Sequence, residues 1–378
     1  MKQGRLLDAP TAAGRLGIAR ATLYAYVSRG LVAAVPDPAD PRRRLYRAAD
    51  IARLAAAQAR GRKPGAIAAA ALDWGVPALP SRITLIAHGR PWYRGGDALR
   101  LAESASLEDA ACLLWDRAAA FDGAAVPVNT APPDGLPDGA SLFERGRVRF
   151  AWAEGAAPAD AAGLLRLLTA CMTGLPASAR PIHDQLAEAW ALGPEGAALL
   201  RMSLVLLADH ELNVSAFAVR VVASGGASLA ACVSAGLAAL SGPRHGGASV
   251  AAAALLRDAA SRGVAAAVAA RPGRALPAFG HPLYPDGDPR AALLLARLPP
   301  DPLRDALAAA AEAASGQAPN IDFALAAACR ALGLPEAAAL VIFAVARGAG
   351  WIAHALEQRA EPRLIRPRAE YVGPRPAF

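Results

Sequence analysis

Apolar segments at helical spacing, separated by Gly and Pro, make up most of the chain from residue 161 onward. Hydrophobic residues account for 54% of the 378 residues and aromatic residues for only 5%, so Ala and Leu supply most of the apolar surface. Side chains of this kind favour closely packed helices over sheets. We therefore predict a mainly all-α fold, in a chain long enough for two or three domains and a sizeable core.

Positive charge is concentrated at the N-terminus of the chain. Residues 1–65 contain 13 Lys or Arg and 4 Asp, a net charge of +9, whereas the whole chain carries +8. Residues 66–378 therefore come to about −1. This asymmetry indicates a polyanionic partner for the N-terminal segment and not for the whole protein.

Two short helices joined by a tight turn are predicted within "DAPTAAGRLGIARATLYAYVSRGLV". The apolar positions that predict them are Leu16, Ile18, Leu23 and Val27. Gly17 lies where a tight turn needs a residue without Cβ. The body of the second helix is expected to open at Thr22 and to end at Gly30. The next stretch, "DPRRRLYRAADIARL", predicts a basic wing followed by another helix.

Residues 7–56 resemble the helix-turn-helix of the MerR and excisionase-like families, in which a T-L-x-x-Y stretch precedes Gly-Leu. The resemblance implies that one set of side chains faces the major groove of DNA and that a second set, on the wing, contacts phosphates. The first set is Arg20, Thr22 and Tyr24, and the second is Arg42, Arg43 and Arg44. The alternative is a small helical interaction module that does not bind DNA. We expect this domain at residues 1–60 and a linker, with a possible short helix, at 61–80.

The segment after the linker, "SRITLIAHGRPWYRGG", predicts a short β-hairpin followed by helices, and residues 120–160 are predicted to be rich in loops. Residues 221–242 carry no charge over 22 positions, so a membrane span is one alternative there. Their four Gly and four Ser make the segment weakly hydrophobic for that role. We predict instead a helix buried between other helices.

The cysteines and the start of the chain indicate a reduced, cytoplasmic protein. The four cysteines are widely spaced, and they are Cys112, Cys171, Cys232 and Cys329. They form neither a CxxC pair nor a metal-ligand cluster with His. The first ten residues, "MKQGRLLDAP", contain no apolar signal-peptide core.

Four polar residues stand beside helix-breaking elements, where a fold can present a side chain to a cleft. They are His210 in "LADHELNVSAFAVR", His245 in "LSGPRHGGAS", His281 in "AFGHPLYPDGDPRA" and Asp322 in "APNIDFAL". Taken singly, each histidine reads as a cap or a surface residue, and Asp322 as a helix N-cap. A metal site is not expected, because no HxxxH or HxH spacing is present.

Taken together, these stretches resemble the motifs of the citrate synthase family, in the family's order. The family carries A-D-H-E-x-N, G-P-x-H-G-G-A, G-F-G-H-x-x-Y-x-x-x-D-P-R-A and P-N-V-D-F, and this chain has "ADHELN", "GPRHGGA", "AFGHPLYPDGDPRA" and "PNIDF". The resemblance runs from about residue 81 to the end. It implies a nearly all-helical homodimer with a large domain at 81–247 and 328–378 and a small domain at 248–327, which closes over oxaloacetate.

The resemblance also implies how each residue acts when an acyl-CoA condenses with oxaloacetate. Asp322 is the base for the thioester methyl group, His245 the donor at the thioester carbonyl, and His281 the proton donor to the ketone oxygen. The side chains that bind oxaloacetate are His210, Arg290, Arg347 and Arg366. Guanidinium forks suit the two carboxylates of that substrate, and Arg366 is expected to reach the partner subunit's active site.

Two departures from the family pattern concern the binding of CoA. The family usually has a basic residue four positions after its histidine, where this chain has Pro285, and Arg274 is a candidate substitute. The family often has Tyr-Ser-Gly after Asp-Phe, where this chain has residues 324–326, Ala-Leu-Ala. Three interpretations stay open: a citrate synthase using acetyl-CoA, a 2-methylcitrate synthase using propionyl-CoA, and a DNA-binding regulator with a metabolite-sensing body. No resident cofactor is expected in any of them.

Overall fold

The computed structural model describes residues 6–28, 31–37, 40–60, 79–127, 139–271, 276–361, 363–369 and 371–374. Two compact units can be distinguished, Ser81–Pro367 and the remainder, Met1–Pro80 with Arg368–Phe378. Each unit has a hydrophobic core of its own. Helices dominate the described residues, which confirms the mainly helical fold predicted from the apolar pattern.

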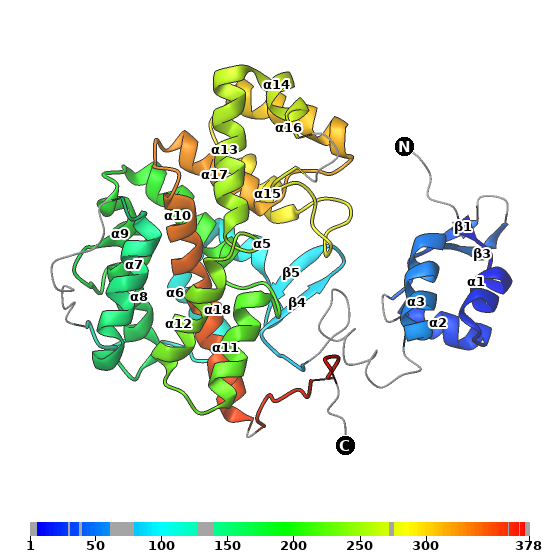
Figure 1. The fold of residues 1–378 in the computed structure, drawn as a ribbon, viewed down its shortest axis with the longest axis horizontal. Helices are drawn as coiled ribbons and strands as arrows, with labels where there is room; N and C mark the ends of the chain where they lie inside the picture. Colours follow the sequence, from blue (N-terminus) through cyan, green and yellow to red (C-terminus); the bar gives the residue numbers. More distant parts are fainter. Residues whose placement is uncertain are drawn as a thin grey trace. The chain divides into compact units, whose positions relative to one another are not determined.

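The N-terminal unit combines helices with a small antiparallel sheet (Figure 1). Its elements are β1 (Leu6–Leu7), α1 (Ala9–Leu16), α2 (Arg20–Ser28), β2 (Ala34–Asp37), β3 (Asp40–Arg47) and α3 (Ala48–Arg60). The sheet order is β1-β3-β2, and β2 pairs antiparallel with β3, which contains the arginines of the predicted wing. The Asp8 side chain caps α1 by accepting from the Thr11 N–H at 2.8 Å. Leu16, Leu23 and Tyr46 are buried in this unit's core.

The turn expected between α1 and α2 lies at Gly17, whose φ of 64° is in the left-handed region. The second helix begins at Arg20, two residues earlier than predicted, because the Thr22 and Leu23 N–H groups already reach the Ala19 carbonyl. Gly30, the predicted end of that helix, lies outside the described residues, as does most of the predicted linker, residues 61–78.

The larger unit opens with the predicted hairpin. It consists of β4 (Thr84–Ala87), β5 (Arg90–Tyr93) and β6 (Gly96–Asp97), in that order across the sheet. Two helices follow, α5 (Ala98–Ser104) and α6 (Leu107–Trp115). The Tyr93 hydroxyl, fully buried, donates to the Val205 carbonyl at 3.0 Å, which ties the hairpin to the helical core.

A bundle of helices surrounds one long central helix, α18 (Ala338–Ala360) (Figure 1). The others are α7 (Leu142–Ala153) with the short 3₁₀ helix η1 (Glu154–Ala156), α8 (Ala161–Thr173), α9 (Ile182–Ala189), α10 (Pro194–Leu207), α11 (Val214–Ser224) and α12 (Leu229–Leu240). Glycines allow the close packing. A Cβ on Gly236 would lie 2.6 Å from the Trp351 ring, and one on Gly348 would lie 2.5 Å from a Leu168 methyl group.

The prediction of one buried helix over residues 221–242 was wrong. α11 ends at Ser224 and α12 begins at Leu229. Gly226, at a φ of 83°, interrupts the helix, and the Ser228 side chain then caps α12 by accepting from the Ala231 N–H at 3.0 Å. Among the described residues, α18 is the helix long and apolar enough to cross a membrane, and 89% of its apolar window is buried inside the protein, as in a core helix.

A second group of helices lies at one end of the larger unit, at the top in Figure 1. It contains α13 (Gly247–Arg262), α14 (Val264–Ala269), α15 (Pro289–Leu295), α16 (Pro302–Ser315) and α17 (Ile321–Ala331). α13 packs against α14, α16, α17 and α18. Residues 81–367 form one unit, and the small domain at 248–327 stays a prediction.

A buried ion pair joins α11 to α18. The fully buried Arg220 guanidinium donates to the Glu357 carboxylate at 2.6 Å and to the Gln358 side-chain carbonyl at 2.9 Å. The other Glu357 oxygen accepts from the Arg82 N–H at 2.8 Å, just before the hairpin. Glu357 therefore holds three segments of the larger unit together.

We expect Glu357→Ala to lower the free energy of unfolding by about 3–5 kcal/mol, because it leaves the Arg220 charge buried without a counter-charge. Urea denaturation measures this change. The control is Glu188→Ala, which removes an exposed ion pair with Arg180 whose side chains are 55% and 56% exposed. That change should stay below about 1 kcal/mol. Equal losses in the two variants would contradict the prediction.

Candidate active site

Two loops interlock through backbone hydrogen bonds, and one leads into His281 while the other leads into Asp322. The Gly280 N–H donates to the Ala318 carbonyl at 2.8 Å, and the Asn320 N–H donates to the Ala278 carbonyl at 2.9 Å. The Asn320 side-chain amide adds a bond to the Gly280 carbonyl at 2.9 Å. These bonds lie on either side of a bridge between residues 279 and 319. The residue before His281 is therefore fixed to the residues that begin α17.

The His281 ring has a defined proton position. Its Nδ1 accepts from the Leu283 N–H at 3.1 Å, so the proton of the neutral imidazole is on Nε2. Burial, followed by the nearby Arg290 charge, lowers the pKa of His281 to about 4. At neutral pH this side chain is an uncharged imidazole with Nε2–H as its donor.

His210 packs edge-on against His281, with ring centroids 4.9 Å apart. Its Nε2 lies 3.0 Å from the Tyr284 hydroxyl. Burial, then the charge of Arg290, lowers the pKa of His210 well below its usual value. The segment that carries His210 lies directly on α18, where a Cβ on Gly350 would come 2.5 Å from the Ala208 carbonyl oxygen.

Arg290 is buried at the start of α15 and carries its own counter-ion. Its guanidinium makes two bonds to Asp288, at 3.0 and 2.8 Å, and lies over the Tyr284 ring at 5.1 Å. Burial alone acts to lower the pKa of Arg290, and the Asp288 charge more than offsets it, so the pKa is raised. Asp288 also accepts from the Ile321 N–H at 3.1 Å, which links Arg290 to the helix of Asp322.

Arg347 on α18 is the second buried guanidinium of the candidate site. Its Nε donates to the Leu207 carbonyl at 2.9 Å, and its guanidinium carbon lies 4.7 Å from the centroid of the Phe343 ring. Within the described ranges no carboxylate oxygen comes within 4.0 Å of it. Burial lowers the pKa of Arg347, and the carboxylate of Asp209 acts in the opposite direction. Asp209 itself is completely buried, 3.3 Å from Nε2 of His354.

His245 lies just before α13, and its Nε2 is 2.8 Å from the Ser215 hydroxyl. Burial, then the charge of Arg347, lowers the pKa of His245 to about 4, so its ring is neutral at pH 7. Ser215 also lies 2.7 Å from the Asn213 side-chain oxygen, and its one proton can serve one of these acceptors. When it serves Nε2, the imidazole proton is on Nδ1, the nitrogen that does not contact Ser215.

Asp322 is in the first turn of α17, after the N-cap Asn320, whose side-chain oxygen accepts the Asp322 N–H at 3.0 Å. The carboxyl group of Asp322 is therefore not the helix cap, the alternative considered from the sequence. Burial raises the pKa of Asp322, and a 2.5 Å hydrogen bond from Ser249 acts against that rise. A buried carboxylate with a raised pKa suits a general base.

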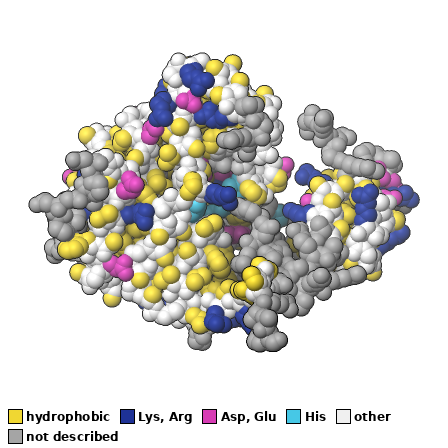
Figure 2. Space-filling model, viewed as in Figure 1, with side chains coloured by type: hydrophobic (Ala, Val, Ile, Leu, Met, Phe, Trp, Pro, Cys, Tyr) yellow, Lys and Arg dark blue, Asp and Glu magenta, His cyan; other side chains and the backbone are white. Residues whose placement is uncertain are grey.

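The structure brings six of the seven predicted residues into one connected region. These six are His210, His245, His281, Arg290, Asp322 and Arg347. Figure 2 shows imidazole side chains, in cyan, within a hollow of the larger unit. Arg366 is exposed in the extended segment 363–369, so its expected role across a subunit interface stays a prediction. Arg274, the candidate substitute for a basic residue at Pro285, lies outside the described residues.

Sequence reasoning missed the residues that support this site. They are Asp209, Ser215, Ser249, Tyr284, Asp288 and His354. Asp288 and Tyr284 lie inside one of the family motifs, which is a signal that could have identified them. Ser249 and His354 follow no local pattern that points to a partner.

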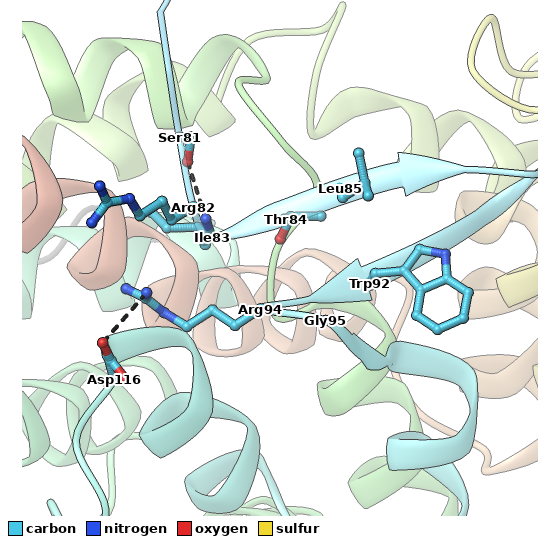
Figure 3. Close-up of a pocket in the computed structure, with 9 residues that line it drawn as sticks. All are labelled: Ser81, Arg82, Ile83, Thr84, Leu85, Trp92, Arg94, Gly95 and Asp116. Atoms are coloured by element: carbon cyan, nitrogen blue, oxygen red, sulfur yellow. Dashed lines mark hydrogen bonds and ion pairs between the residues drawn. The ribbon is translucent and has the colours of Figure 1, made fainter. Parts of the chain in front are cut away.

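A separate hollow of about 430 Å³ lies beside the hairpin (Figure 3). Its lining contains none of the predicted catalytic or substrate-binding residues and consists of Ser81–Leu85, Trp92, Arg94, Gly95 and Asp116. Arg94 is already engaged there, by the Leu114 carbonyl at 2.9 Å and by Asp116 at 3.7 Å. This hollow is distinct from the site of His281 and Asp322.

The residues predicted to contact DNA lie on α2 and β3 of the N-terminal unit. Arg20 is exposed and Tyr24 is 54% exposed, whereas Thr22 is partly buried. Arg43 and Arg44 are exposed on β3, and Arg43 lies 3.4 Å from Asp40. The side chain of Arg42 is outside the described part of the chain. Figure 2 shows several basic side chains on the visible face of this unit.

We expect Gly280→Ala to lower kcat by about 10- to 10²-fold, because misplacing a catalytic group by an ångström has an effect of that size. Gly280 has a φ of 74°, and an added Cβ would lie 1.6 Å from the Gln317 side-chain oxygen. Gly316→Ala is the matched control. Its φ is 69° and no described atom lies within 4 Å of an added Cβ, so it introduces the same backbone strain without a clash. A kcat that falls equally in both variants would disprove a specific effect on His281.

This chain is similar in sequence to known proteins. The family model for the citrate synthase C-terminal domain matches residues 159–368. A 2-methylcitrate synthase of Shewanella oneidensis is 38% identical over 192 residues, which are 47% of this chain and 51% of that protein. A citrate synthase of Haloferax volcanii is 38% identical over 188 residues, 46% of this chain and 49% of that protein. The chain thus spans about half the length of the curated relatives it matches.

Solved structures extend the likeness over most of the larger unit. The citrate synthase of Thermotoga maritima aligns with a TM-score of 0.67 and 26% identity, over 80% of this chain and 96% of that chain. The citrate synthase of Thermoplasma acidophilum, solved with carboxymethyl coenzyme A and oxaloacetate, aligns with a TM-score of 0.66. It is 23% identical, over 80% of this chain and 96% of that chain, and at that identity it shows the shared fold.

Proposed function

The chain belongs to the citrate synthase family, and on that premise we propose that residues 81–378 condense acetyl-CoA with oxaloacetate to give citrate and CoA. The observation that carries the proposal is the interlock of the two loops that hold His281 and Asp322. Buried Arg290 and Arg347 beside them supply the positive charge that a dianion needs. No cofactor takes part, and acetyl-CoA is the co-substrate.

The proposed reaction assigns one step to each polar residue. Asp322 removes a proton from the thioester methyl group while His245 donates a hydrogen bond to the thioester oxygen. The resulting carbon nucleophile attacks the ketone carbon of oxaloacetate, and His281 gives its Nε2 proton to the new alkoxide. His281 then regains a proton from solvent, and Asp322 returns to solvent the proton that it took from the methyl group. Water then hydrolyses the thioester and releases CoA. His245 needs its proton on Nδ1 for this role, the form favoured when Ser215 donates to Nε2.

The test is the release of CoA from purified protein with oxaloacetate and either acetyl-CoA or propionyl-CoA, followed with a thiol reagent. Acetyl-CoA should have the higher kcat/KM. A preference for propionyl-CoA would favour the second candidate, a 2-methylcitrate synthase, to which the Shewanella relative and the loss of a basic residue at Pro285 point. No release with either thioester would reject condensation and leave the sensor alternative.

We further propose a homodimer in which Arg366 of each chain completes the active site of the other, and a cytoplasmic location. Residues 1–60 are proposed to bind duplex DNA, with the dimer setting the spacing of two half-sites. The support for DNA binding is the exposed Arg20 and Tyr24 on α2, the exposed Arg43 and Arg44 on β3 and the net charge of this segment. The alternative is an interaction module.

We expect replacement of Arg42, Arg43 and Arg44 by Ala to weaken binding to every duplex alike. The slope of log affinity against log salt should flatten by about 0.9 for each phosphate that is no longer bound. Tyr24→Ala should instead alter sequence preference. Binding titrations at several salt concentrations measure the slope, and selection from a random duplex library, which a dimer should enrich in inverted repeats, measures the sequence preference. Binding no tighter than that of an unrelated basic protein at the same salt would leave the interaction module.

A further inference from the structure

A buried hydroxyl lies directly against the candidate base. Ser249 is in the first turn of α13 and is completely buried, and its Oγ donates to Asp322 Oδ1 at 2.5 Å. That length is typical of a hydroxyl bonded to a carboxylate, which is about twice as strong as a neutral hydrogen bond. The two residues come from different helices, α13 and α17, that pack against each other.

The other groups near Asp322 interact with its carboxyl group differently from Ser249. The backbone N–H of Asp322 donates to the Asn320 side-chain oxygen and not to the Asp322 carboxyl group. Arg290, from the start of α15, lowers the pKa of Asp322 through its charge, and Asp288, which is paired with Arg290, acts in the opposite direction. Arg347, from α18, acts on Asp322 through charge alone. Within the described ranges, Ser249 is the donor that touches the Asp322 carboxyl group.

We propose that Ser249 is a positioning residue for Asp322: its hydroxyl holds Oδ1, favours the carboxylate form and leaves Oδ2 to accept the methyl proton. The inference rests on the proposed function, because it assigns a role within that site. Burial raises the pKa of Asp322, and the hydrogen bond from Ser249 acts against that rise. Without the hydroxyl, the pKa of Asp322 would therefore be higher. The base is active above its pKa, so activity would then begin at higher pH.

The test compares kcat/KM for acetyl-CoA between pH 5 and 9 in the parent, Ser249→Ala and Ser249→Thr. We expect the acidic limb to move up by about one to two pH units in Ser249→Ala, the size of one hydrogen bond to a charged group. Thr keeps the hydroxyl and should restore the limb. Ser203→Ala is the matched control: Ser203 is also buried, and its hydroxyl donates to the Leu199 carbonyl at 2.8 Å on α10. Its profile should match the parent.

A second measurement does not depend on turnover. In Ser249→Ala the folded state must bury an ionised Asp322 without its hydrogen bond, so the loss of stability should grow as pH rises from 4 to 8. At low pH the Asp322 carboxyl group is protonated in the folded parent and in the folded variant, so the difference in stability between the two proteins should be small. In an Asp322→Asn background this pH dependence should disappear.

The results of these experiments distinguish failure of the proposed condensation activity from failure of the role proposed for Ser249. A parent protein that releases no CoA, together with the pH-dependent stability difference, would reject the proposed function and keep the Ser249–Asp322 coupling. An unshifted acidic limb, a pH-independent stability difference, or the same shift in Ser203→Ala would overturn the role of Ser249. A folded Ser249→Thr protein that fails to restore the limb would also count against it.

Discussion

The Asp322→Asn protein is expected to lose roughly 10²–10⁴-fold in kcat, the usual contribution of a general base. Asn matches the shape of Asp but cannot take the methyl proton. His281→Ala should lose a similar factor, because its Nε2–H is the proposed donor to the ketone oxygen. Steady-state assays of folded protein measure both losses.

Asp305→Asn is the control for the first of these changes. Asp305 is an exposed carboxylate on α16 that pairs with Arg304 at 2.7 Å, outside the candidate site. Its kcat should equal that of the parent. Near-normal turnover in Asp322→Asn or His281→Ala would remove that residue from the mechanism.

The second large effect is expected at Arg347. Arg347→Leu should raise KM for oxaloacetate and lower kcat/KM on the order of 10²–10³-fold, within the range for losing one buried charged partner. Arg347→Lys should restore little, because an ammonium lacks the planar fork that binds a carboxylate at two points. Arg180→Leu, at an exposed ion pair, is the control and should behave as the parent. Retention of the parent kcat/KM by Arg347→Leu would contradict substrate binding there.

Arg347 gives a clearer test of oxaloacetate binding than Arg290, although the sequence analysis assigned both residues the same role. Replacing Arg290 would leave Asp288 buried without its partner, and Asp288 also binds the start of α17. Loss of activity in that variant would combine substrate binding with damage to the fold.

Mixed dimers test the shared site. Arg347→Leu and Arg366→Leu chains, refolded together in equal amounts, should form dimers of which half pair the two variants. Each such dimer has one intact site, so about a quarter of the parent activity should return. Activity that stays at the level of the separate variants would show that Arg366 does not act across the interface.

Local patterns along the chain were sufficient to predict the mainly helical fold and to suggest the residues that are proposed to carry the chemistry. The period of the Ala/Leu segments predicted the helices, because side chains three and four apart share one face of a helix. The motifs around His210, His245, His281 and Asp322 were recognisable for a similar reason, since each is local in the chain. The errors were also local: Gly226 and the Ser228 cap divide a segment whose lack of charge suggested one helix.

Which supporting group meets which functional one could be seen only in the folded chain. Ser249 lies 73 positions from Asp322, and Ser215 lies 30 positions from His245. These pairs depend on how α13 packs against α17 and on where α11 begins, and no periodicity along the chain records that. The protonation of each site residue follows from the same packing, because burial and the nearest charge set a pKa. The residues proposed to react were therefore recognisable in the sequence, and the packing of distant helices determined their proton positions and their partners.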